Sequence, residues 1–224
     1  MIDIHSHILP GVDDGSRSLE MTKNILAEYV REGIEKVMCT PHQGKALRRP
    51  EVLKAAFAKL VDDVKDYPVQ LLLGSEIYYY EGMLPDINSG ELLTLNNTKY
   101  VLVEFSTRND VVYIPDAVYD LSVAGYRPIV AHIERYDYLK ESAWAEIKDN
   151  GALIQVNAAS FAKKDYARTI KRLFKRGVVD FIASDCHSDG RRNVDFTAAR
   201  AYITKKAPGE YYKFFGDNDI FADI

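Results

Sequence analysis

Residues 158–187, AASFAKKDYARTIKRLFKRGVVDFIASDCH, contain the pattern that decides the fold. A helix-like stretch at 158–175 is followed by Gly177 and then by the apolar run 178–183, which predicts a buried β-strand. Glycine tolerates the left-handed conformation that closes a helix, so the three parts form one helix–strand unit. The strand ends in a polar segment, 184–187.

The same unit recurs along the chain. Gly33, Gly125 and Gly151 each close a helix-like stretch and precede an apolar, often β-branched run. The pattern predicts helices at 19–32, 51–65, 114–124, 138–148, 158–175 and 194–206, with another from residue 211. It predicts strands at 2–5, 34–40, 69–73, 100–105, 128–131, 152–156 and 178–183. Residues 92–95, joined to 100–105 through Asn96 and Asn97, favour a hairpin or a short excursion into a further strand.

Alternating strands and helices with short connections predict parallel strands with right-handed crossovers. About seven such strands suit an α/β fold of the (β/α)7 barrel type, formed by residues 1–224 as a single domain. An open doubly wound sheet is the alternative. The glycine-rich phosphate loop that such sheets carry after their first strand is absent here.

Composition narrows the range of functions. The chain has 224 residues, a formal charge of −4 and 47% hydrophobic residues, enough to bury a real core. Its pI of 5.8 gives no reason to expect nucleic-acid binding. We expect no membrane insertion, because no signal peptide or long apolar run is visible. Two distant cysteines, Cys39 and Cys186, indicate a reducing, cytoplasmic compartment. The oligomeric state cannot be derived.

Polar side chains lie where the predicted strands end, which in a parallel barrel is the end that carries chemistry. All five histidines belong to this set: His5, His7, His42, His132 and His187. Carboxylates end three of the apolar strands, at Glu76, Glu104 and Asp185, and Asp13 and Asp14 occupy an acidic turn that ordinary turn chemistry also explains. Taken alone, His42 and His132 are more typical of structural, hydrogen-bonding histidines.

Together these residues predict a metal centre. His5 and His7 share one face of a strand, as do Asp185 and His187, and each pair can close on one ion. The set offers more nitrogen and oxygen donors than one ion needs, which favours two or three ions. Imidazole and carboxylate without thiolate favour Mn, Fe or Zn over an all-oxygen Ca site. Clustered ions with open positions favour hydrolysis, most naturally at phosphorus.

The motifs resemble a known family. MIDIHSHILPGVDDG at the start is similar to the opening motif of the polymerase-and-histidinol-phosphatase (PHP) superfamily. With TPH at 40–42, GSE at 74–76, VEF at 103–105, HIERY at 132–136, QVNAAS at 155–160 and SDCH at 184–187, the chain resembles the bacterial manganese-dependent tyrosine-protein phosphatases of capsular and exopolysaccharide clusters. The family pattern usually reads HPERY, where this chain has Ile133.

The resemblance implies a distorted (β/α)7 TIM-like barrel, the PHP fold, with three metal ions, Mn by preference, with Fe, Zn or Mg as other occupants. It implies one ion held by His5, His7, Glu76 and Asp185, a second by Glu76, Glu104 and His132, and a third by Asp14, His42 and His187. It assigns phosphate binding to Arg135 and to an arginine after SDCH, either Arg191 or Arg192, with spacing favouring Arg192. The implied substrate is phosphotyrosine on a protein, the tail of a bacterial tyrosine kinase.

Three alternatives remain at this point. Cys186 and Arg192 fit the C-x5-R spacing of cysteine-dependent tyrosine phosphatases, although Asp189 between them disfavours an anion cradle. The second alternative is a small-molecule phosphomonoesterase of the histidinol-phosphatase kind or a nuclease-like phosphodiesterase. The acidic net charge disfavours the nuclease-like version. A non-catalytic module that binds metal structurally is the third. The basic residues 171–176 are interpreted as a solvated face that complements the helix dipole, in preference to a phosphate-binding patch.

Overall fold

The computed structural model describes residues 1–47, 49–108 and 113–216. One sheet contains β1 (Ile2–Ser6), β2 (Lys36–Cys39) and β4 (Gln70–Leu73), in the order β1-β2-β4. The other has the order β3-β5-β6-β7-β8-β9 and comprises β3 (His42–Gln43), β5 (Glu76–Tyr78), β6 (Tyr100–Glu104), β7 (Arg127–Val130), β8 (Leu153–Asn157) and β9 (Phe181–Ala183). Every strand pairing is parallel, as the sequence predicts.

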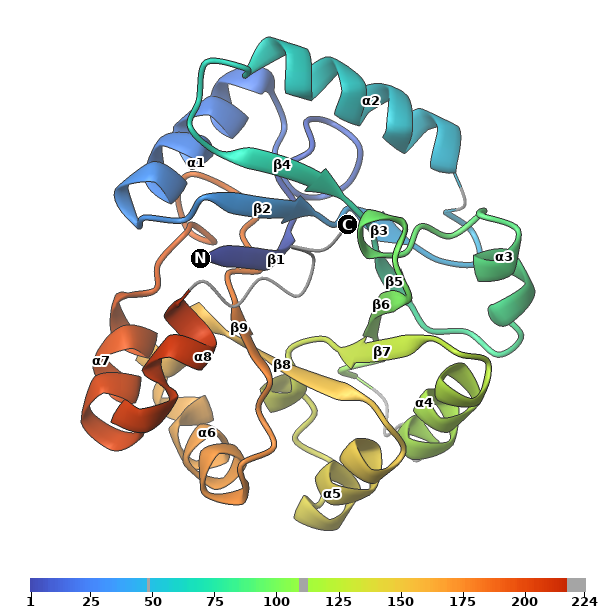
Figure 1. Cartoon of the computed structure of the whole chain (residues 1–224), viewed down its shortest axis with the longest axis vertical. Coiled ribbons are helices and arrows are strands. Elements are labelled where there is room, and N and C mark those ends of the chain that lie inside the picture. The colour runs from blue at the N-terminus through green and yellow to red at the C-terminus, as the bar shows by residue number, and fades with distance from the viewer. Residues whose placement is uncertain (48, 109–112, 217–224) are drawn as a thin grey trace.

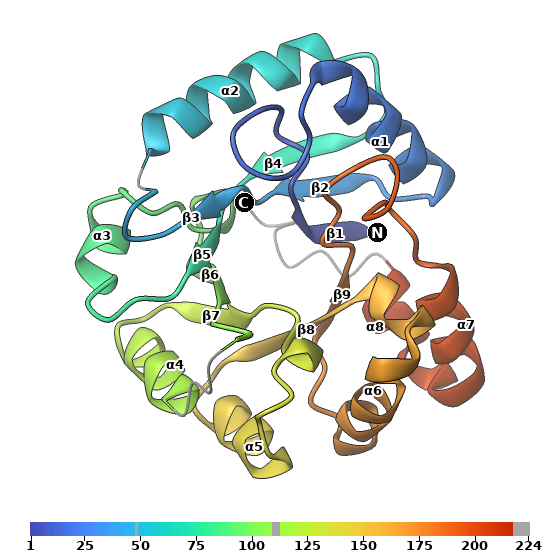
Figure 2. The ribbon, with the colours of Figure 1, turned by 180° about the vertical axis from the view of Figure 1, so that it is seen from behind.

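The two sheets are parts of one closed barrel. Short breaks separate β2 from β3 and β4 from β5, and the hydrogen bonding continues across them, from Gly74 N to Cys39 O (2.9 Å) and from Glu76 N to Pro41 O (3.2 Å). Each broken pair therefore serves as one barrel strand. The barrel closes where β1 meets the end of β9, through the bridge between Ser6 and Cys186. The predicted barrel of seven strands is confirmed (Figure 1 and, from behind, Figure 2).

Helices form an outer ring around the strands (Figure 1). They are α1 (Leu19–Arg31), α2 (Pro50–Asp63), α3 (Leu84–Asn88), α4 (Ile114–Val123), α5 (Glu141–Asp149), α6 (Lys164–Arg176), α7 (Thr197–Lys206) and α8 (Tyr211–Phe215). Ser18 caps α1 by accepting a hydrogen bond from Met21 N, and Gly177, at φ 65°, closes α6. None of the helices in the described ranges combines the length and apolar character that a membrane span needs.

The barrel interior is filled by apolar side chains, one from each of several strands. Ile4, Met38, Leu72, Leu102, Ile129 and Ala183 belong to this inner cluster, while a larger cluster lies between the strands and the outer helices. Side chains alternate along a strand, so the residue two positions after an interior one also points inward. Glu104 follows Leu102 in this way, and Asp185 follows Ala183. The apolar plug thus forms the floor beneath the polar strand ends.

Four details differ from the sequence prediction. The hairpin at 92–105 is wrong, because β6 pairs in parallel with β5 and β7 and residues 95–97 form a 3-10 turn in which Asn96 and Asn97 have positive φ. The helix predicted from residue 158 begins only at Lys164, after a 3-10 turn at Ala158–Ala162. The short elements β3, β5 and α3 were not predicted. The predicted strand 178–183 is regular only over Phe181–Ala183.

Candidate metal centre

The predicted ligands converge at the carboxyl end of the barrel. A first group lies around the carboxylates of Glu76 and Asp185. His5 Nε2 is 3.4 Å from Glu76 Oε1 and 3.5 Å from Asp185 Oδ1. His7 Nε2 is 3.2 Å from Glu76 Oε2 and 3.2 Å from His5 Nε2. All four side chains are buried, and the donor atoms of His5, His7 and Glu76 lie close enough together to hold one ion.

A second group shares Glu76. His132 Nε2 lies 3.0 Å from Glu76 Oε1 and 3.5 Å from Glu104 Oε1. His42 Nδ1 lies 3.1 Å from the other oxygen of Glu76. The donor atoms of His42, Glu76 and Glu104 are all close enough together to hold one ion. Glu76 therefore stands between the first and second groups, as a bridging carboxylate would.

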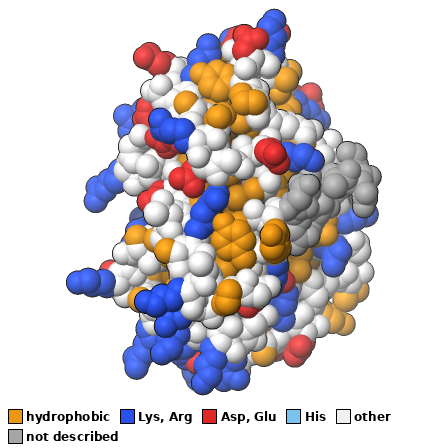
Figure 3. All heavy atoms as spheres, turned by 60° about the vertical axis from the view of Figure 1, so that its left-hand side comes forward, with side chains coloured by type: hydrophobic (Ala, Val, Ile, Leu, Met, Phe, Trp, Pro, Cys, Tyr) orange, Lys and Arg blue, Asp and Glu red, His pale blue; other side chains and the backbone are white. Residues whose placement is uncertain are grey.

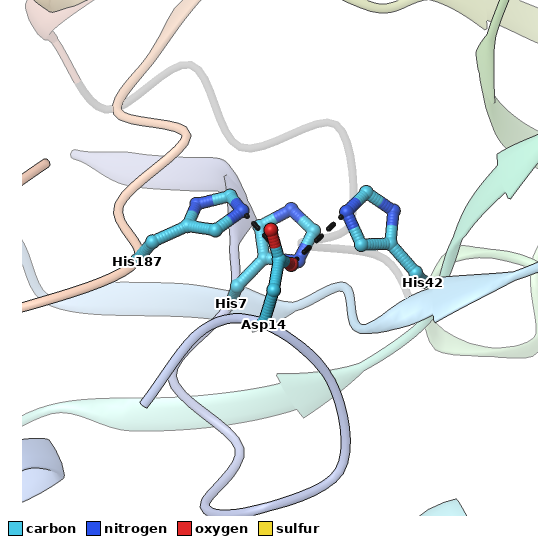
Figure 4. Close-up of side chains that lie close together, drawn as sticks. All are labelled: His7, Asp14, His42 and His187. Carbon is cyan, nitrogen blue, oxygen red and sulfur yellow. Dashed lines mark ion pairs between the residues drawn. The ribbon is translucent and has the colours of Figure 1, made fainter. Parts of the chain in front are cut away.

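The third group surrounds Asp14, in the turn after β1. Asp14 Oδ1 is 3.3 Å from His42 Nε2 and 3.4 Å from His187 Nε2, as the dashed lines in Figure 4 show. His7 completes the group and faces the same space (Figure 4). The turn comes this close only because residue 15 is glycine: a Cβ there would lie 2.1 Å from the carbonyl oxygen of His7.

Three of the imidazoles are oriented by an oxygen acceptor at Nδ1. His5 Nδ1 is 3.2 Å from Gln155 Oε1, His7 Nδ1 is 2.9 Å from Asp13 Oδ2, and His187 Nδ1 is 3.0 Å from the carbonyl oxygen of Asp185. Each acceptor fixes the proton on Nδ1 and leaves Nε2 with a bare lone pair. This is the arrangement by which proteins orient histidines that bind metal.

The bare Nε2 atoms face carboxylate oxygens, and this arrangement tests whether a metal fits. A lone pair and a carboxylate repel each other unless a cation lies between them. The buried Nε2 of His187 finds no hydrogen-bond donor among the described residues. For His7 burial would lower the pKa, but Asp13 and Glu76 raise it to about 10, so without metal a proton takes the place of a cation. The donor set therefore fits divalent ions.

Two of the predicted ligands have unusual backbone conformations. His132 and Asp185 have positive φ values of 33° and 52°. Non-glycine residues rarely adopt this region, and such strain concentrates at functional sites. Both residues directly follow a barrel strand or its extension, where the turn of the backbone aims the side chain into the barrel mouth. The two strained backbone positions are thus found at residues whose side chains meet in the candidate site.

The predicted phosphate-binding arginines lie beside the first group. Arg192 Nη2 donates to Asp185 Oδ2 at 2.8 Å, and Arg135 Nη1 is 3.7 Å from the same oxygen. Both line a cavity of about 310 Å³, together with Arg191 and Lys163. Both Arg191 and Arg192 line the cavity, and Arg192 in addition contacts Asp185 of the first group.

The geometry disfavours Cys186 as a nucleophile. Its side chain is fully buried, with Sγ 3.5 Å from the carbonyl oxygen of Ser188. Burial raises the pKa of this thiol, so it stays protonated at neutral pH. Arg192, the second half of the C-x5-R spacing, binds Asp185.

Sequence reasoning named Asp13 and the motif QVNAAS but missed that Asp13 and Gln155 orient the candidate ligands. Asp13 receives hydrogen bonds from Gly15 N and His42 N as well as contacting His7. Gln155 Oε1 accepts from His132 N, and its amide nitrogen donates to Asn157, which in turn donates to Asp185. The available signal was a polar residue inside an apolar strand: Gln155 interrupts the run LIQV.

An α/β barrel whose rim gathers imidazoles, carboxylates and arginines is typical of metal-dependent hydrolases that act on phosphate esters. The chain belongs to the CpsB/CapC family, described as capsular polysaccharide synthesis, which it matches over residues 1–219. This confirms the resemblance drawn from the motifs.

Two relatives illustrate the match. The tyrosine-protein phosphatase CpsB of Streptococcus pneumoniae is 33% identical, over 97% of this chain and 96% of its own. A solved structure from work on YwqE of Bacillus subtilis and CpsB of Streptococcus pneumoniae, described as unique metal-dependent tyrosine phosphatases, matches with a TM-score of 0.85 and 32% identity, over 97% of this chain and 89% of that one. A histidinol phosphate phosphatase from Lactococcus lactis shares the fold alone, with a TM-score of 0.61 at 15% identity, over 92% of this chain and 94% of that one.

Proposed function

We propose that this chain is a metal-dependent phosphatase that removes phosphate from tyrosine side chains of proteins. The observation that carries the proposal is the convergence of three imidazole–carboxylate groups at the barrel mouth, directly beside Arg135 and Arg192. The names of the relatives support tyrosine as the phosphorylated residue.

The proposed ligand sets divide these side chains among three ions, with His42 also lying beside Glu76 and His7 beside Asp14. His5, His7, Glu76 and Asp185 would hold one ion, Glu76, Glu104 and His132 a second, and Asp14, His42 and His187 a third. The mixture of imidazole and carboxylate suits Mn²⁺, Fe²⁺ or Zn²⁺, and the family resemblance supports Mn²⁺ among them. When bound, such ions supply Lewis acidity to the phosphate and to an attacking water.

The arginines would hold the phosphate in place. Their guanidinium groups bind phosphate through paired hydrogen bonds, which lysine cannot reproduce. Arg192 contacts Asp185 at 2.8 Å, so an arriving phosphate would meet a guanidinium that is already oriented. Arg135, one-third exposed, would complete the clamp from the turn that follows β7.

We further propose that the substrate is the tail of a bacterial tyrosine kinase that controls polysaccharide synthesis. The description of the matched family supports this setting. A cytoplasmic location is supported by Cys39 and Cys186, which are both buried as free thiols.

A substrate panel tests the function. Protein dialysed against chelator and reloaded with Mn²⁺ would be assayed with p-nitrophenyl phosphate, a phosphotyrosine peptide, its phosphoserine counterpart and histidinol phosphate. We expect turnover of the first two, with bound metal quantified in parallel by elemental analysis. Preference for histidinol phosphate would establish a small-molecule phosphatase instead. Stoichiometric metal without turnover of any ester would leave a non-catalytic metal-binding module.

A further inference from the structure

Helix α6 carries an unusual concentration of positive charge. The chain has a net charge of −4, yet the 14 residues 163–176 contain seven of its 29 Lys and Arg residues and one acidic residue, Asp165. The basic residues are Lys163, Lys164, Arg168, Lys171, Arg172, Lys175 and Arg176. In the space-filling view, Lys and Arg side chains gather on the lower part of the face shown, the level at which α6 and α7 lie in Figure 1 (Figure 3).

These charges occupy one face of the helix. Lys164, Arg168 and Lys175 follow one another at spacings of four and seven, so they line up along the outer side of α6. All are exposed, while Ile170 and Leu173 on the opposite side are buried. We call the six basic residues 164, 168, 171, 172, 175 and 176 the α6 basic face.

The helix dipole explains only part of this pattern. Positive charge stabilises the last turn of a helix, which accounts for Lys175 and Arg176. Near the first turn positive charge is unfavourable, yet Lys164 and Arg168 lie in the first half of α6. The effect fades beyond the first turn, so the dipole opposes Lys164 and does not account for Arg168.

Internal ion pairs account for only some of the cations. Glu141 of α5 accepts hydrogen bonds from Arg172 and Arg176, and these two arginines lower its pKa. Arg168 and Lys175 have no ion-pair partner in the described part of the chain. They line a depression of about 650 Å³ together with Arg172, Arg176 and Glu141. This depression offers an excess of positive charge to a partner.

The basic face begins at the edge of the candidate active site. Lys163 lines the same cavity as Arg135 and Arg192, and its neighbour Lys164 is the first residue of α6. The start of α6 is therefore within reach of a polypeptide whose phosphotyrosine occupies the cavity. The contiguity of the two surfaces favours a second part of the same substrate as the occupant of the basic face.

We propose that the α6 basic face binds an acidic segment of the phosphoprotein substrate, outside the phosphotyrosine itself. This inference rests on the proposed phosphatase function. From Lys164 to Lys175 the helix rises roughly 16 Å, which an extended chain covers in about five residues. The acidic segment would thus lie about five to ten residues from the phosphotyrosine. The contacts are exposed, so they add affinity and association rate rather than catalytic power.

The test compares matched variants on matched substrates. Arg168→Ala/Lys175→Ala removes two charges from the basic face, and Lys59→Ala/Lys65→Ala removes two from the α2 side of the barrel. Each would be assayed with p-nitrophenyl phosphate and with phosphotyrosine peptides bearing five Glu on one flank, or Gln in their place. We expect KM for an acidic peptide to rise about three- to tenfold in the first variant only, with the Gln peptides and p-nitrophenyl phosphate unchanged within twofold.

A third variant tests the opposite direction. Glu141→Gln removes the carboxylate that neutralises Arg172 and Arg176, so KM for the acidic peptide should fall two- to threefold. Equal KM values for acidic and Gln peptides in the wild-type protein, on both flanks, would overturn the docking inference while leaving the phosphatase intact. Loss of binding to phosphatidylserine vesicles in Arg168→Ala/Lys175→Ala, without any change in peptide KM, would assign the face to a membrane surface instead. Failure of the wild type to turn over any phosphate ester would remove the phosphatase function and this inference with it.

Discussion

One carboxylate connects the arginine and the metal-binding group: Asp185 accepts a hydrogen bond from Arg192 through Oδ2 at 2.8 Å, while its Oδ1 faces His5 and His7. The arginine proposed to bind phosphate and the side chains proposed to bind metal therefore meet at a single carboxylate. His5 and other nearby imidazoles hold the pKa of Asp185 well below its usual range against the effect of burial, so it carries negative charge at neutral pH. A substitution of Arg192 would therefore remove a hydrogen bond from a side chain of the candidate metal site.

Substitution can distinguish the role of Arg192 from that of its neighbour Arg191. We expect Arg192→Ala to raise KM for p-nitrophenyl phosphate about ten- to a hundredfold, because charge-assisted hydrogen bonds contribute roughly 1.5–3 kcal/mol each. Arg191→Ala removes the same charge from the cavity wall and should change KM less than threefold. Steady-state kinetics with Mn²⁺ provide the measurement, and equal effects of the two substitutions would contradict the assignment.

Gln155 should control metal affinity without touching metal. Gln155→Leu removes the acceptor that orients His5 and holds the backbone of His132, so we expect a tenfold to hundredfold loss of Mn²⁺ affinity by calorimetry. Gln43→Leu is the matched control, since within the described ranges the side chain of this buried glutamine bonds to backbone atoms of Glu91 and Leu93. Gln43→Leu should lower stability and leave metal affinity within threefold. Unchanged affinity in Gln155→Leu would show that the orienting bond is dispensable.

We expect phosphatase activity to require bound metal and not to require Cys186. Because burial raises the pKa of the Cys186 thiol, Cys186→Ser should keep most of the activity, and iodoacetamide should leave the folded protein active. Dialysis against chelator should abolish activity, and Mn²⁺ should restore it. An inactive Cys186→Ser protein that still binds its metal would overturn the metal mechanism.

The seam between the first and last strands depends on Tyr29. Its hydroxyl donates to the buried carboxylate of Asp3 at 2.7 Å, and Asp3 also accepts from Ser184 N. Tyr29→Phe should therefore cost about 1–3 kcal/mol in urea unfolding, against little change for Tyr119→Phe, whose ring is 53% exposed.

The pH dependence of this cost has a definite sign. Burial raises the pKa of Asp3, and the hydrogen bond from Tyr29 opposes that rise by stabilising the ionised form. Stability contributed by protonated Asp3 is lost as pH rises through its raised pKa. The Tyr29→Phe penalty should accordingly be larger at pH 7 than at pH 4. A penalty independent of pH would mean that Asp3 does not titrate in this range.

The barrel and the convergence of the strand ends could be predicted from the sequence, because both follow from local patterns of hydrophobic residues and from the geometry of parallel strands. Periodicity locates helices and strands, and parallel strands place all their carboxyl ends at one rim. Position along a strand therefore predicted where His132 and Glu104 would lie. The metal-binding roles of these residues remain proposals that the experiments above address.

Other features depend on contacts that sequence spacing does not reveal. Asn96 and Asn97 carry the composition of a hairpin turn, but the strand that follows finds parallel partners from elsewhere in the chain. The sequence pattern did not predict β3 and β5, because each is a short continuation of the preceding strand after a break at Pro41 or Gly74. The hydrogen bonds of Gln155 link three strand ends, which no local pattern predicts.

The barrel closes where its first strand meets its last, and the first candidate ligand group draws on both sides of that seam. His5 and His7 are synthesised well before Asp185 and His187, so the candidate ligand groups stay incomplete until residue 187 has left the ribosome. An ion that needs ligands from both sides of the seam could bind only after that point. A chain truncated before residue 185 should therefore lose that ion.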